Sequence, residues 1–478
     1  LLDDPRVTAI GLHIEGFGDL RSWEALAHKA HTKNIPLIAL KSGKSQQAQT
    51  AAVSHTASLA GSDAGAEALL ARLGIRRAHS LPVFLEALKL SHQFGQITSN
   101  RIASISCSGG EAALAADTAH KTRLTFPPIN ARQRADLTAA LGPMVALANP
   151  LDYHTYIWRD EVAMTKAWAA MADPDIALTL LISDYPRADI CDPTDWDCVT
   201  NAAIAAAQKT QRPYAVVASL GELMPEHIAK TLMANGVAAM NGLDHGIKAL
   251  DLLTRKLPQD LNPVILPGVA RDAELIDEHL AKQKLAQFGL TVPYGITVLD
   301  RAEAAHAAVT IGFPVVLKTL GMAHKTGSNG LALGLNSSKE VNTALLNLAP
   351  GSVLVEHMIG EAVMELLVGI TRDQAHGFVL TIATGGIMTE LLDDSTSLLV
   401  PAARDHVTTA LNSLNMAPLM YGYRGKPPIN FKALLDAIDA LQSYVFANAD
   451  SLEEVEINPL ICTAQAAIAV DALIRKTV

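Results

Sequence analysis

Residues 101–122 read "RIASISCSGGEAALAADTAHKT". A short run rich in Ile, Ala and Ser comes first, paired glycines follow, and an Ala-rich stretch of helical character ends the segment. A strand that enters a helix through a glycine turn is typical of a βα unit. The segment therefore predicts a parallel sheet whose strands alternate with helices.

The same alternation continues on both sides of this unit. Upstream, "VTAIGLHIE" and "PLIALKSG" predict strands around the helix "LRSWEALAHKAHTKN". Downstream, the strand-like runs "IALTLLISD" and "YAVVASLG" alternate with Ala-rich helices. Residues 257–268 carry three prolines and no helical period, which indicates a linker. After residue 270, longer strands and a Gly-rich loop predict a mixed α+β domain.

Composition narrows the class of protein. A chain of 478 residues is longer than one hydrophobic core usually serves, so several domains are expected. A hydrophobic content of 49% with 18% charged residues is typical of a soluble globular enzyme. The net charge of −10, without a Lys/Arg run, argues against nucleic acid as a partner. No apolar run approaches the ~20 residues of a membrane helix.

Two further features concern the chain's context. Its four cysteines form no CxxC pair, which argues against zinc and suits a reducing cytoplasm. The N-terminus lacks Met and opens on a helix end followed by a strand. We therefore expect the chain to be a piece of a longer polypeptide.

The segment "AAVSHTASLAGSD", residues 51–63, holds His55 among small residues. With no Cys, Glu or second His beside it, the pattern does not suit a metal site. Small residues permit close approach to a phosphate, and a neutral imidazole is a good nucleophile near pH 7. The pattern alone fits either a phosphoryl carrier or an ordinary surface-loop histidine.

The C-terminal region carries the features of a nucleotide site. "GFPVVLKTLGMAHKTGSNGLALGL" places Lys318 at the end of an apolar strand, before a Gly-rich loop that lacks Walker spacing. Asn458 and Asp471 fall near the ends of two strands, and their oxygens suit Mg²⁺. Each residue alone also fits a structural role, but their order favours a site for a nucleoside triphosphate.

These motifs together resemble the NDP-forming acyl-CoA synthetase family, within the superfamily of succinyl-CoA synthetase. The resemblance extends over essentially the whole chain and rests on "HIEG", "VSHTASLAGSD", "SGGEA", "NPLD", "PVVLK", "HKT", "VGITRD", "GGI", "GYRG" and "EINPL". It implies an α/β protein with two flavodoxin-like parallel-sheet domains, the first incomplete, followed by an α+β ATP-grasp domain. The implied ranges are 1–95, 98–256 and 269–478, with the linker at 257–268.

The resemblance also implies roles for individual residues. His55 would carry the phosphoryl group, Glu15 would steady it, and His324 would relay phosphate near the ATP site. The implied nucleotide, anion and metal contacts are Lys318, Glu356, Ser108, Gly109, Gly110, Asn458 and Asp471.

Three departures from the family pattern stand out. The family's "HKTDVGGV" is "HKTGSNGL" here, so Gly327 replaces an acidic residue. Asp393 and Leu398 stand at positions that are basic in the family. The CoA-binding Rossmann domain and the first strands of the first flavodoxin-like domain are expected upstream in the full-length chain.

The implied reaction joins a carboxylic acid to CoA with ATP and Mg²⁺, through an acyl phosphate and phosphorylated His55. Two reacting centres would explain a mobile loop that carries an imidazole. We expect a cytoplasmic enzyme that forms a homo-oligomer, with no membrane partner.

The acid is less defined by the sequence. Asn149 precedes "YHTYIW", which gathers Tyr153, His154, Tyr156 and Trp158 in a chain with few aromatic residues. The aromatic cluster fits core packing, or the wall of a substrate pocket. Such a wall suits an aryl acid, or an onium acid through cation–π contacts.

Other activities stay open at this point. An ATP-dependent lyase of the same superfamily, acting on dimethylsulfoniopropionate through its CoA thioester, is one alternative. A catalytically impaired regulatory relative is another, because Gly327 and Leu398 fall in the nucleotide-binding region. A protein-acetyltransferase relative is a third, although no acetyltransferase-like segment follows Val478.

Overall fold

The computed structural model describes residues 1–45, 47, 61–257, 260, 262–269, 272–321, 329–385 and 394–477. Contacts divide the chain into two compact units. Unit 1 comprises Leu1–Glu15, Asp19–Ala51 and Leu70–Leu261, and unit 2 comprises Gly16–Gly18, Ala52–Leu69 and Asn262–Val478.

The first sheet of unit 1 is parallel, in the order β1–β2–β3. Its strands are β1 (Ile10–Ile14), β2 (Leu37–Lys41) and β3 (Arg76–Ala78). Helix α1 (Leu20–Thr32) connects β1 to β2, and the Asp19 side chain caps its first turn. Helix α4 (Leu81–Phe94) follows β3 and is capped by Ser80. The predicted strand–helix–strand pattern is therefore present here.

The second sheet of unit 1 is parallel, in the order β5–β4–β6–β7–β8. Its strands are β4 (Ile102–Ser106), β5 (Leu151–Asp152), β6 (Leu178–Ile182), β7 (Tyr214–Ala218) and β8 (Val237–Asn241). All residues of β4, β6 and β7 are buried, as expected for strands covered on both faces.

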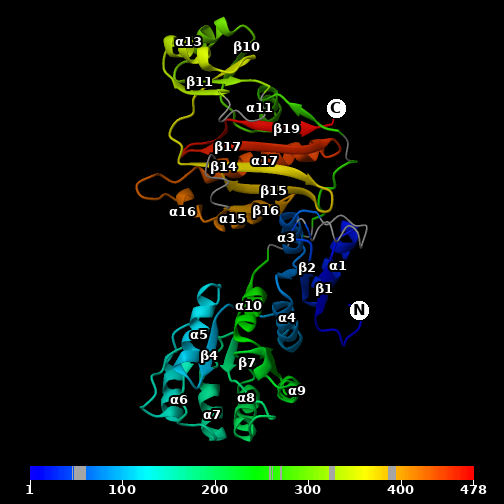
Figure 1. Ribbon diagram of the computed structural model, residues 1–478, viewed down its shortest axis with the longest axis vertical. Coiled ribbons are helices and arrows are strands. Elements are labelled where there is room, and N and C mark those ends of the chain that lie inside the picture. Colours follow the sequence, from blue (N-terminus) through cyan, green and yellow to red (C-terminus); the bar gives the residue numbers. More distant parts are fainter. Residues whose placement is uncertain are drawn as a thin grey trace. The chain divides into compact units, whose positions relative to one another are not determined.

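Helices cover both faces of this second sheet (Figure 1). One face packs against α6 (Ala131–Leu141), α7 (Glu161–Met171), α8 (Asp197–Thr210) and α9 (Glu226–Ala234). The other face packs against α4, α5 (Gly109–His120) and α10 (Leu243–Thr254). This doubly covered parallel sheet is the arrangement that residues 101–122 predict.

Unit 2 contains two largely antiparallel sheets. The smaller sheet has the order β10 (Gly295–Val298), β13 (Val353–His357), β11 (Val315–Thr319) and β12 (Leu331–Leu335). Its core includes α12 (Ala304–Ile311) and α13 (Ser338–Asn347). The larger sheet has the order β16 (Ser395–Leu399), β15 (Gly377–Thr384), β14 (Met364–Asp373), β17 (Leu452–Cys462), β19 (Ala472–Lys476) and β9 (Glu274–Ile276), with β18 (Ala467–Ala469) beside β17.

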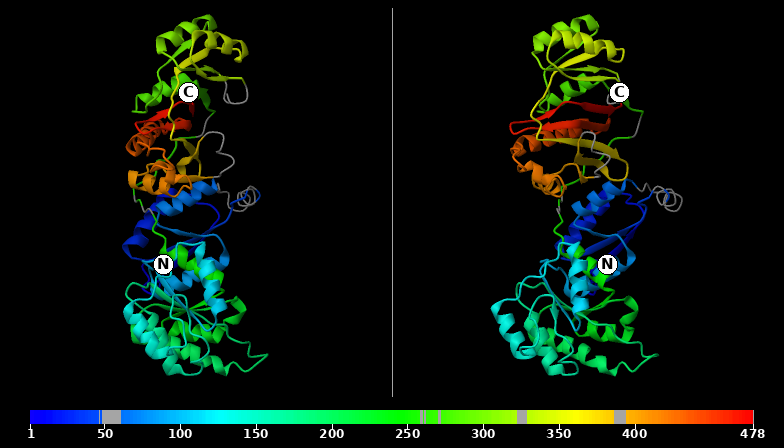
Figure 2. Two further views of the ribbon diagram at one scale, coloured as in Figure 1. Left: turned by 90° about the vertical axis from the view of Figure 1, so that its left-hand side faces the viewer. Right: turned by 60° about the vertical axis from the view of Figure 1, so that its left-hand side comes forward.

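Other helices of unit 2 pack on the larger sheet. They are α11 (Glu278–Ala286), α15 (Arg404–Asn412), α16 (Ala417–Met420) and α17 (Phe431–Asn448). Figure 2 shows the orange helices on one face of this sheet. Short 3₁₀ turns occupy Thr194–Trp196, Gly221–Leu223 and Arg301–Glu303. The predicted fold class, two flavodoxin-like parallel sheets followed by an α+β ATP-grasp domain, is confirmed.

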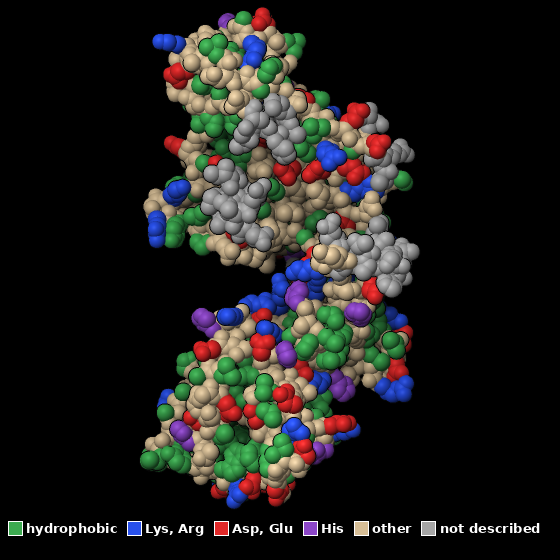
Figure 3. Space-filling model, in the orientation of Figure 1, with side chains coloured by type: hydrophobic (Ala, Val, Ile, Leu, Met, Phe, Trp, Pro, Cys, Tyr) green, Lys and Arg blue, Asp and Glu red, His purple; other side chains and the backbone are tan. Residues whose placement is uncertain are grey.

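The surface carries both signs of charge. Figure 3 shows Lys, Arg, Asp and Glu side chains interspersed on the visible face. Within the part of the chain that the structure describes, no helix is both long and apolar enough to span a bilayer.

Candidate functional site

The carboxyl ends of β1 and β2 place Glu15 beside Lys41 and Ser42. Ile14 pairs with Lys41 at the last position of the two parallel strands. The buried Lys41 ammonium donates to the Glu15 carbonyl oxygen at 3.1 Å and also to that of Ser42. Glu15 therefore lies beside the start of the segment that leads to His55, which itself lies outside the described residues.

The start of α5 is the candidate anion-binding site in the second sheet. Ser108 occupies the N-cap position and makes no side-chain capping bond, so backbone N–H groups at the helix start stay available. Ser108, Gly109 and Gly110 are exposed. A Cβ on Gly109 would lie 3.2 Å from Oδ2 of Asp152, closer than most such contacts.

Three carboxylates gather at this same edge of the sheet. Glu111 lies in the first turn of α5, Asp152 ends β5, and Asp184 follows β6. Burial, and then the charges of Asp184 and Asp152, raise the pKa of Glu111 to about 7. Asp184 accepts hydrogen bonds from the Ser219 N–H at 2.6 Å and from its Oγ at 2.5 Å. Sequence reasoning missed this cluster, although Asp184 ends the predicted strand "IALTLLISD".

Asn149 supports the same edge through its side-chain amide. The amide oxygen accepts a hydrogen bond from the Ser104 N–H at 3.1 Å. The amide nitrogen donates to the carbonyl oxygens of Ile102 and Pro127, both at 3.0 Å. Asn149 thus joins the loop before β5 to β4, and its direct contact with substrate stays a prediction.

The aromatic segment after Asn149 divides between core and surface. Tyr153 is buried and meets Trp168 edge-on, with ring centroids 6.2 Å apart. Trp158 is partly buried and meets Trp196 edge-on at 5.4 Å. The His154 side chain is 45% exposed. Of these, His154 and Trp158 retain surface that a ligand could contact, whereas Tyr153 belongs to the core.

Four buried charges form the centre of the candidate nucleotide site. Lys318 on β11 lies 2.9 Å from Glu278 Oε1 and 3.0 Å from Glu356 Oε2. Lys282, one turn after Glu278 on α11, lies 2.7 Å from Glu278 Oε1 and also bonds Glu356 Oε1. Both ammonium groups donate to the Val470 carbonyl oxygen. The predicted residues Lys318 and Glu356 are thus brought together with two residues that sequence reasoning missed.

The two predicted metal ligands face each other on neighbouring strands. Ile457 of β17 pairs with Ala472 of β19 in antiparallel register. Asn458 follows Ile457 and Asp471 precedes Ala472, so the antiparallel register sets Asn458 opposite Asp471. Within the described ranges, no group of three or more His, Cys, Asp and Glu side chains could hold a metal ion. A Mg²⁺ ion at this pair would need phosphate oxygens and water as further ligands.

The turn between β14 and β15 contacts the segment that follows the histidine loop, within unit 2. Asp373 Oδ2 accepts hydrogen bonds from the Ser62 N–H at 2.8 Å and from its Oγ at 2.7 Å. The hydrogen bonds to His376 and Ser62 hold the pKa of Asp373 well below its usual range, although burial opposes this shift. His376 is fully buried, with Nδ1 2.9 Å from Asp373 and its ring edge-on to Phe17.

Some predicted positions lie outside the described residues. These are His55 and His324, together with the departures Gly327 and Asp393. Leu398, which shares the second departure with Asp393, lies in β16 opposite Leu380.

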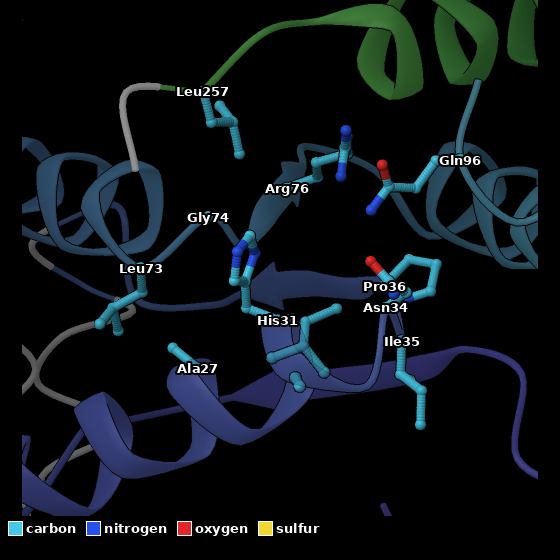
Figure 4. A pocket seen from close by; sticks show the side chains of 12 residues that line it. Ala27, His31, Asn34, Ile35, Pro36, Leu73, Gly74, Arg76, Gln96 and Leu257 are labelled. Atoms are coloured by element: carbon cyan, nitrogen blue, oxygen red, sulfur yellow. The ribbon is translucent and has the colours of Figure 1, made fainter. Parts of the chain in front are cut away.

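A cavity of about 190 Å³ lies at the opposite, amino ends of β2 and β3. Figure 4 shows His31 from α1, Arg76 from β3 and Gln96 after α4 around it. Within the described residues, Nε of the Arg76 side chain has no hydrogen-bond partner, and burial lowers the pKa of this side chain. The carboxyl ends of α1 and α4 border the cavity, and their partial negative charge favours a cation there.

Two family models match the chain. The model of the succinyl-CoA ligase like flavodoxin domain matches residues 1–91, and the model of an ATP-grasp domain matches residues 269–475. The two models therefore cover the N-terminal and the C-terminal part of the chain.

Curated relatives match nearly the full length of the chain. A trans-feruloyl-CoA synthase from an unknown prokaryotic organism is 26% identical, over 99% of this chain and 69% of its own. An ADP-forming acetate–CoA ligase from Methanocaldococcus jannaschii is 26% identical, over 96% of this chain and 69% of its own. An ADP-forming 4-hydroxybutyrate–CoA ligase from Nitrosopumilus maritimus is 22% identical, over 96% of this chain and 69% of its own.

A solved structure of dinucleotide forming acetyl-coenzyme A synthetase 1 from Ca. Korarchaeum cryptofilum is also similar. It is 25% identical with a TM-score of 0.40, over 43% of this chain and 94% of that chain. The family models thus identify a succinyl-CoA ligase like flavodoxin domain in residues 1–91 and an ATP-grasp domain in residues 269–475, and the curated relatives that match nearly the whole chain are named as CoA ligases or synthases.

Proposed function

We propose that this protein makes an acyl-CoA from a carboxylic acid, CoA and ATP, with phosphorylated His55 as an intermediate. The relatives are named for acetate, 4-hydroxybutyrate and ferulate, so a carboxylic acid is the shared substrate class. The observation that carries the proposal is the convergence at Val470. Lys318 bonds its carbonyl oxygen, and the next residue, Asp471, lies opposite Asn458.

The chemistry proceeds in three displacements. A ring nitrogen of His55 attacks the γ-phosphorus of ATP, so that a P–N bond forms as the bond to ADP breaks. The acid's carboxylate oxygen then attacks this phosphorus, which releases the imidazole and forms the acyl phosphate. The CoA thiolate attacks the acyl carbon, and inorganic phosphate leaves.

Residues of this chain would take part in the first and the later steps of these reactions. Lys318 would donate to a nucleotide phosphate, while Asn458 and Asp471 would hold Mg²⁺, which neutralises phosphate charge. The Glu15 carboxylate would accept an imidazole N–H and so orient His55. N–H groups at Gly109 and Gly110 would bind the phosphoryl group beside the acid.

Location and assembly are part of the same proposal. Cys107, Cys191, Cys198 and Cys462 are free thiols, which agrees with a reducing cytoplasm. We expect the protein to form a homo-oligomer. The lyase, acetyltransferase and regulatory alternatives gain no support from the names of the relatives.

Phosphoenzyme labelling tests the proposal. The full-length protein incubated with γ-labelled ATP and Mg²⁺ should gain an acid-labile, base-stable label. His55→Ala should abolish this label, and Glu15→Gln should reduce it, whereas His28→Ala on the exposed face of α1 should not. Label that persists in His55→Ala would contradict the carrier role. Thioester formation over a panel of acids would then identify the substrate.

A further inference from the structure

We propose that Lys282 is a positioning residue of the nucleotide site, which stays bonded to Glu278 and Glu356 while Lys318 turns to a nucleotide phosphate. The inference rests on the proposed nucleotide role of Lys318. It assigns to Lys282 a function that neither the motifs nor the comparisons give it.

Lys318 uses its hydrogen-bond capacity on groups of the protein itself. An ammonium group has three N–H donors. Lys318 has three acceptors around it, Glu278 Oε1 at 2.9 Å, Glu356 Oε2 at 3.0 Å and the Val470 carbonyl oxygen. No donor is left for a phosphate, so Lys318 must release a partner when a nucleotide binds.

The second step is what such a release would leave behind. The side chains of Glu278 and Glu356 are 5% and 2% exposed, so water cannot replace a lost cation. An uncompensated carboxylate in such a place is strongly unfavourable. Lys318 can therefore leave only if another cation contacts both carboxylates.

Lys282 meets this requirement. It contacts the same two carboxylates and the same carbonyl oxygen as Lys318, at 2.7 Å from Glu278 Oε1 and 3.1 Å from Val470. After Lys318 turns away, Lys282 still bonds both carboxylates. The two lysines are thus interchangeable partners of one acidic pair.

The repulsion between the ammonium groups of Lys282 and Lys318 also favours the departure of Lys318. Burial, and then the charge of Lys318, lowers the pKa of Lys282 to about 8, although Glu356 and Asp471 oppose this shift. Because both ammonium groups share one carbonyl oxygen, the departure of Lys318 relieves their repulsion. The two lysines balance the two carboxylates in the ligand-free site, and Lys282 remains bonded to both carboxylates once Lys318 has turned away.

Calorimetric titration of the full-length protein with Mg-ADP tests the inference. Lys282→Met should weaken binding about tenfold or more, because release of Lys318 would strand two buried carboxylates. Lys282→Arg should retain most of the affinity. The double variant Glu278→Gln/Lys282→Met should recover to within about threefold of the unmodified protein, since one stranded carboxylate is removed. Lys432→Met, in an exposed pair with Asp436, is the matched control.

The outcomes separate this inference from its alternatives. Unchanged affinity in Lys282→Met, or no recovery in the double variant, overturns it. If Lys282→Met does not fold, Glu278→Gln alone decides, because it should bind Mg-ADP at least as tightly as the unmodified protein, and weaker binding refutes the inference. Thermal unfolding of each ligand-free variant distinguishes lost stability from lost affinity. If Lys318→Met leaves binding unchanged, the proposed nucleotide site itself is wrong.

Discussion

Asn458 lies opposite Asp471, one position beyond the residue pair Ile457–Ala472 of the antiparallel ladder between β17 and β19. Side chains at opposed positions of such a ladder share a face of the sheet. A carboxylate and an amide oxygen on one face form half of an oxygen-ligand set for Mg²⁺. The register of the sheet thus gives a physical reason to treat these two residues as one site.

Removal of either oxygen should change how nucleotide affinity depends on Mg²⁺. We expect Asp471→Asn to weaken Mg-ADP binding more than Asn458→Ala does, because only the Asp471→Asn substitution removes a negative charge from the site. Calorimetric titrations at several Mg²⁺ concentrations would measure this effect. Asp405→Asn on the exposed first turn of α15 serves as the control. An unchanged Mg²⁺ dependence in both variants would place the metal elsewhere.

The raised pKa of Glu111 predicts a pH-dependent contribution to stability. In the unfolded chain its carboxyl group titrates near pH 4.5, and in the folded protein near pH 7. The folded state holds the proton more tightly between these values, so the contribution is fully present below pH 4.5 and is lost as pH rises through 7. Glu111→Gln should remove this loss and stabilise the protein by about 1 kcal/mol at pH 8, because Glu111 is only half-buried.

Urea unfolding at pH 5 and pH 8 would measure the effect. The difference in stability between Glu111→Gln and the unmodified protein should become more favourable to the variant at the higher pH. Glu226→Gln, at an exposed ion pair with Lys230, gives the comparison for a carboxyl group with a lowered pKa. The same difference at both pH values would argue against a proton held at Glu111.

Sequence patterns predict the strands and helices here better than the charged networks. β1 lies inside "VTAIGLHIE", and its exposed residues alternate with half-buried or buried ones, as the period of a strand predicts. Glu278 and Lys282, by contrast, have the i,i+4 spacing of an ordinary exposed ion pair on a helix. Only the packing of α11 beside β11, β13 and Val470 buries that pair. No local pattern carries that information.

The contact between Gly61 and His376 predicts a strong requirement for glycine. Gly61 has a φ of +63°, and a Cβ there would lie 2.3 Å from Cε1 of the buried His376. Gly61→Ala should therefore combine backbone strain with a clash, at about 2–5 kcal/mol. Gly95→Ala is a matched control, because Gly95 has a φ of +67° and no atom within 4 Å of the added Cβ.

Differential scanning calorimetry of both variants would separate the two effects. Gly95→Ala should lose about 1–2 kcal/mol from backbone strain alone. Equal losses in the two variants would mean that Gly61 does not pack against His376. A larger loss for Gly61→Ala that His376→Ala partly reverses would support the contact.

The cluster of Glu111, Asp152 and Asp184 predicts which acids the enzyme accepts. A second carboxylate on the substrate would approach three negative groups at the edge of the sheet, where burial strengthens the repulsion. Matched pairs of dicarboxylic acids and their half-amides differ in charge but little in shape. We expect kcat/KM for each half-amide to exceed that of its dicarboxylate by about tenfold.

Glu111→Gln should narrow this ratio by admitting the dicarboxylate, whereas Glu226→Gln should leave it unchanged. Equal activity on both members of a pair, or a ratio that Glu111→Gln does not alter, would show that the acid's substituent binds away from these carboxylates.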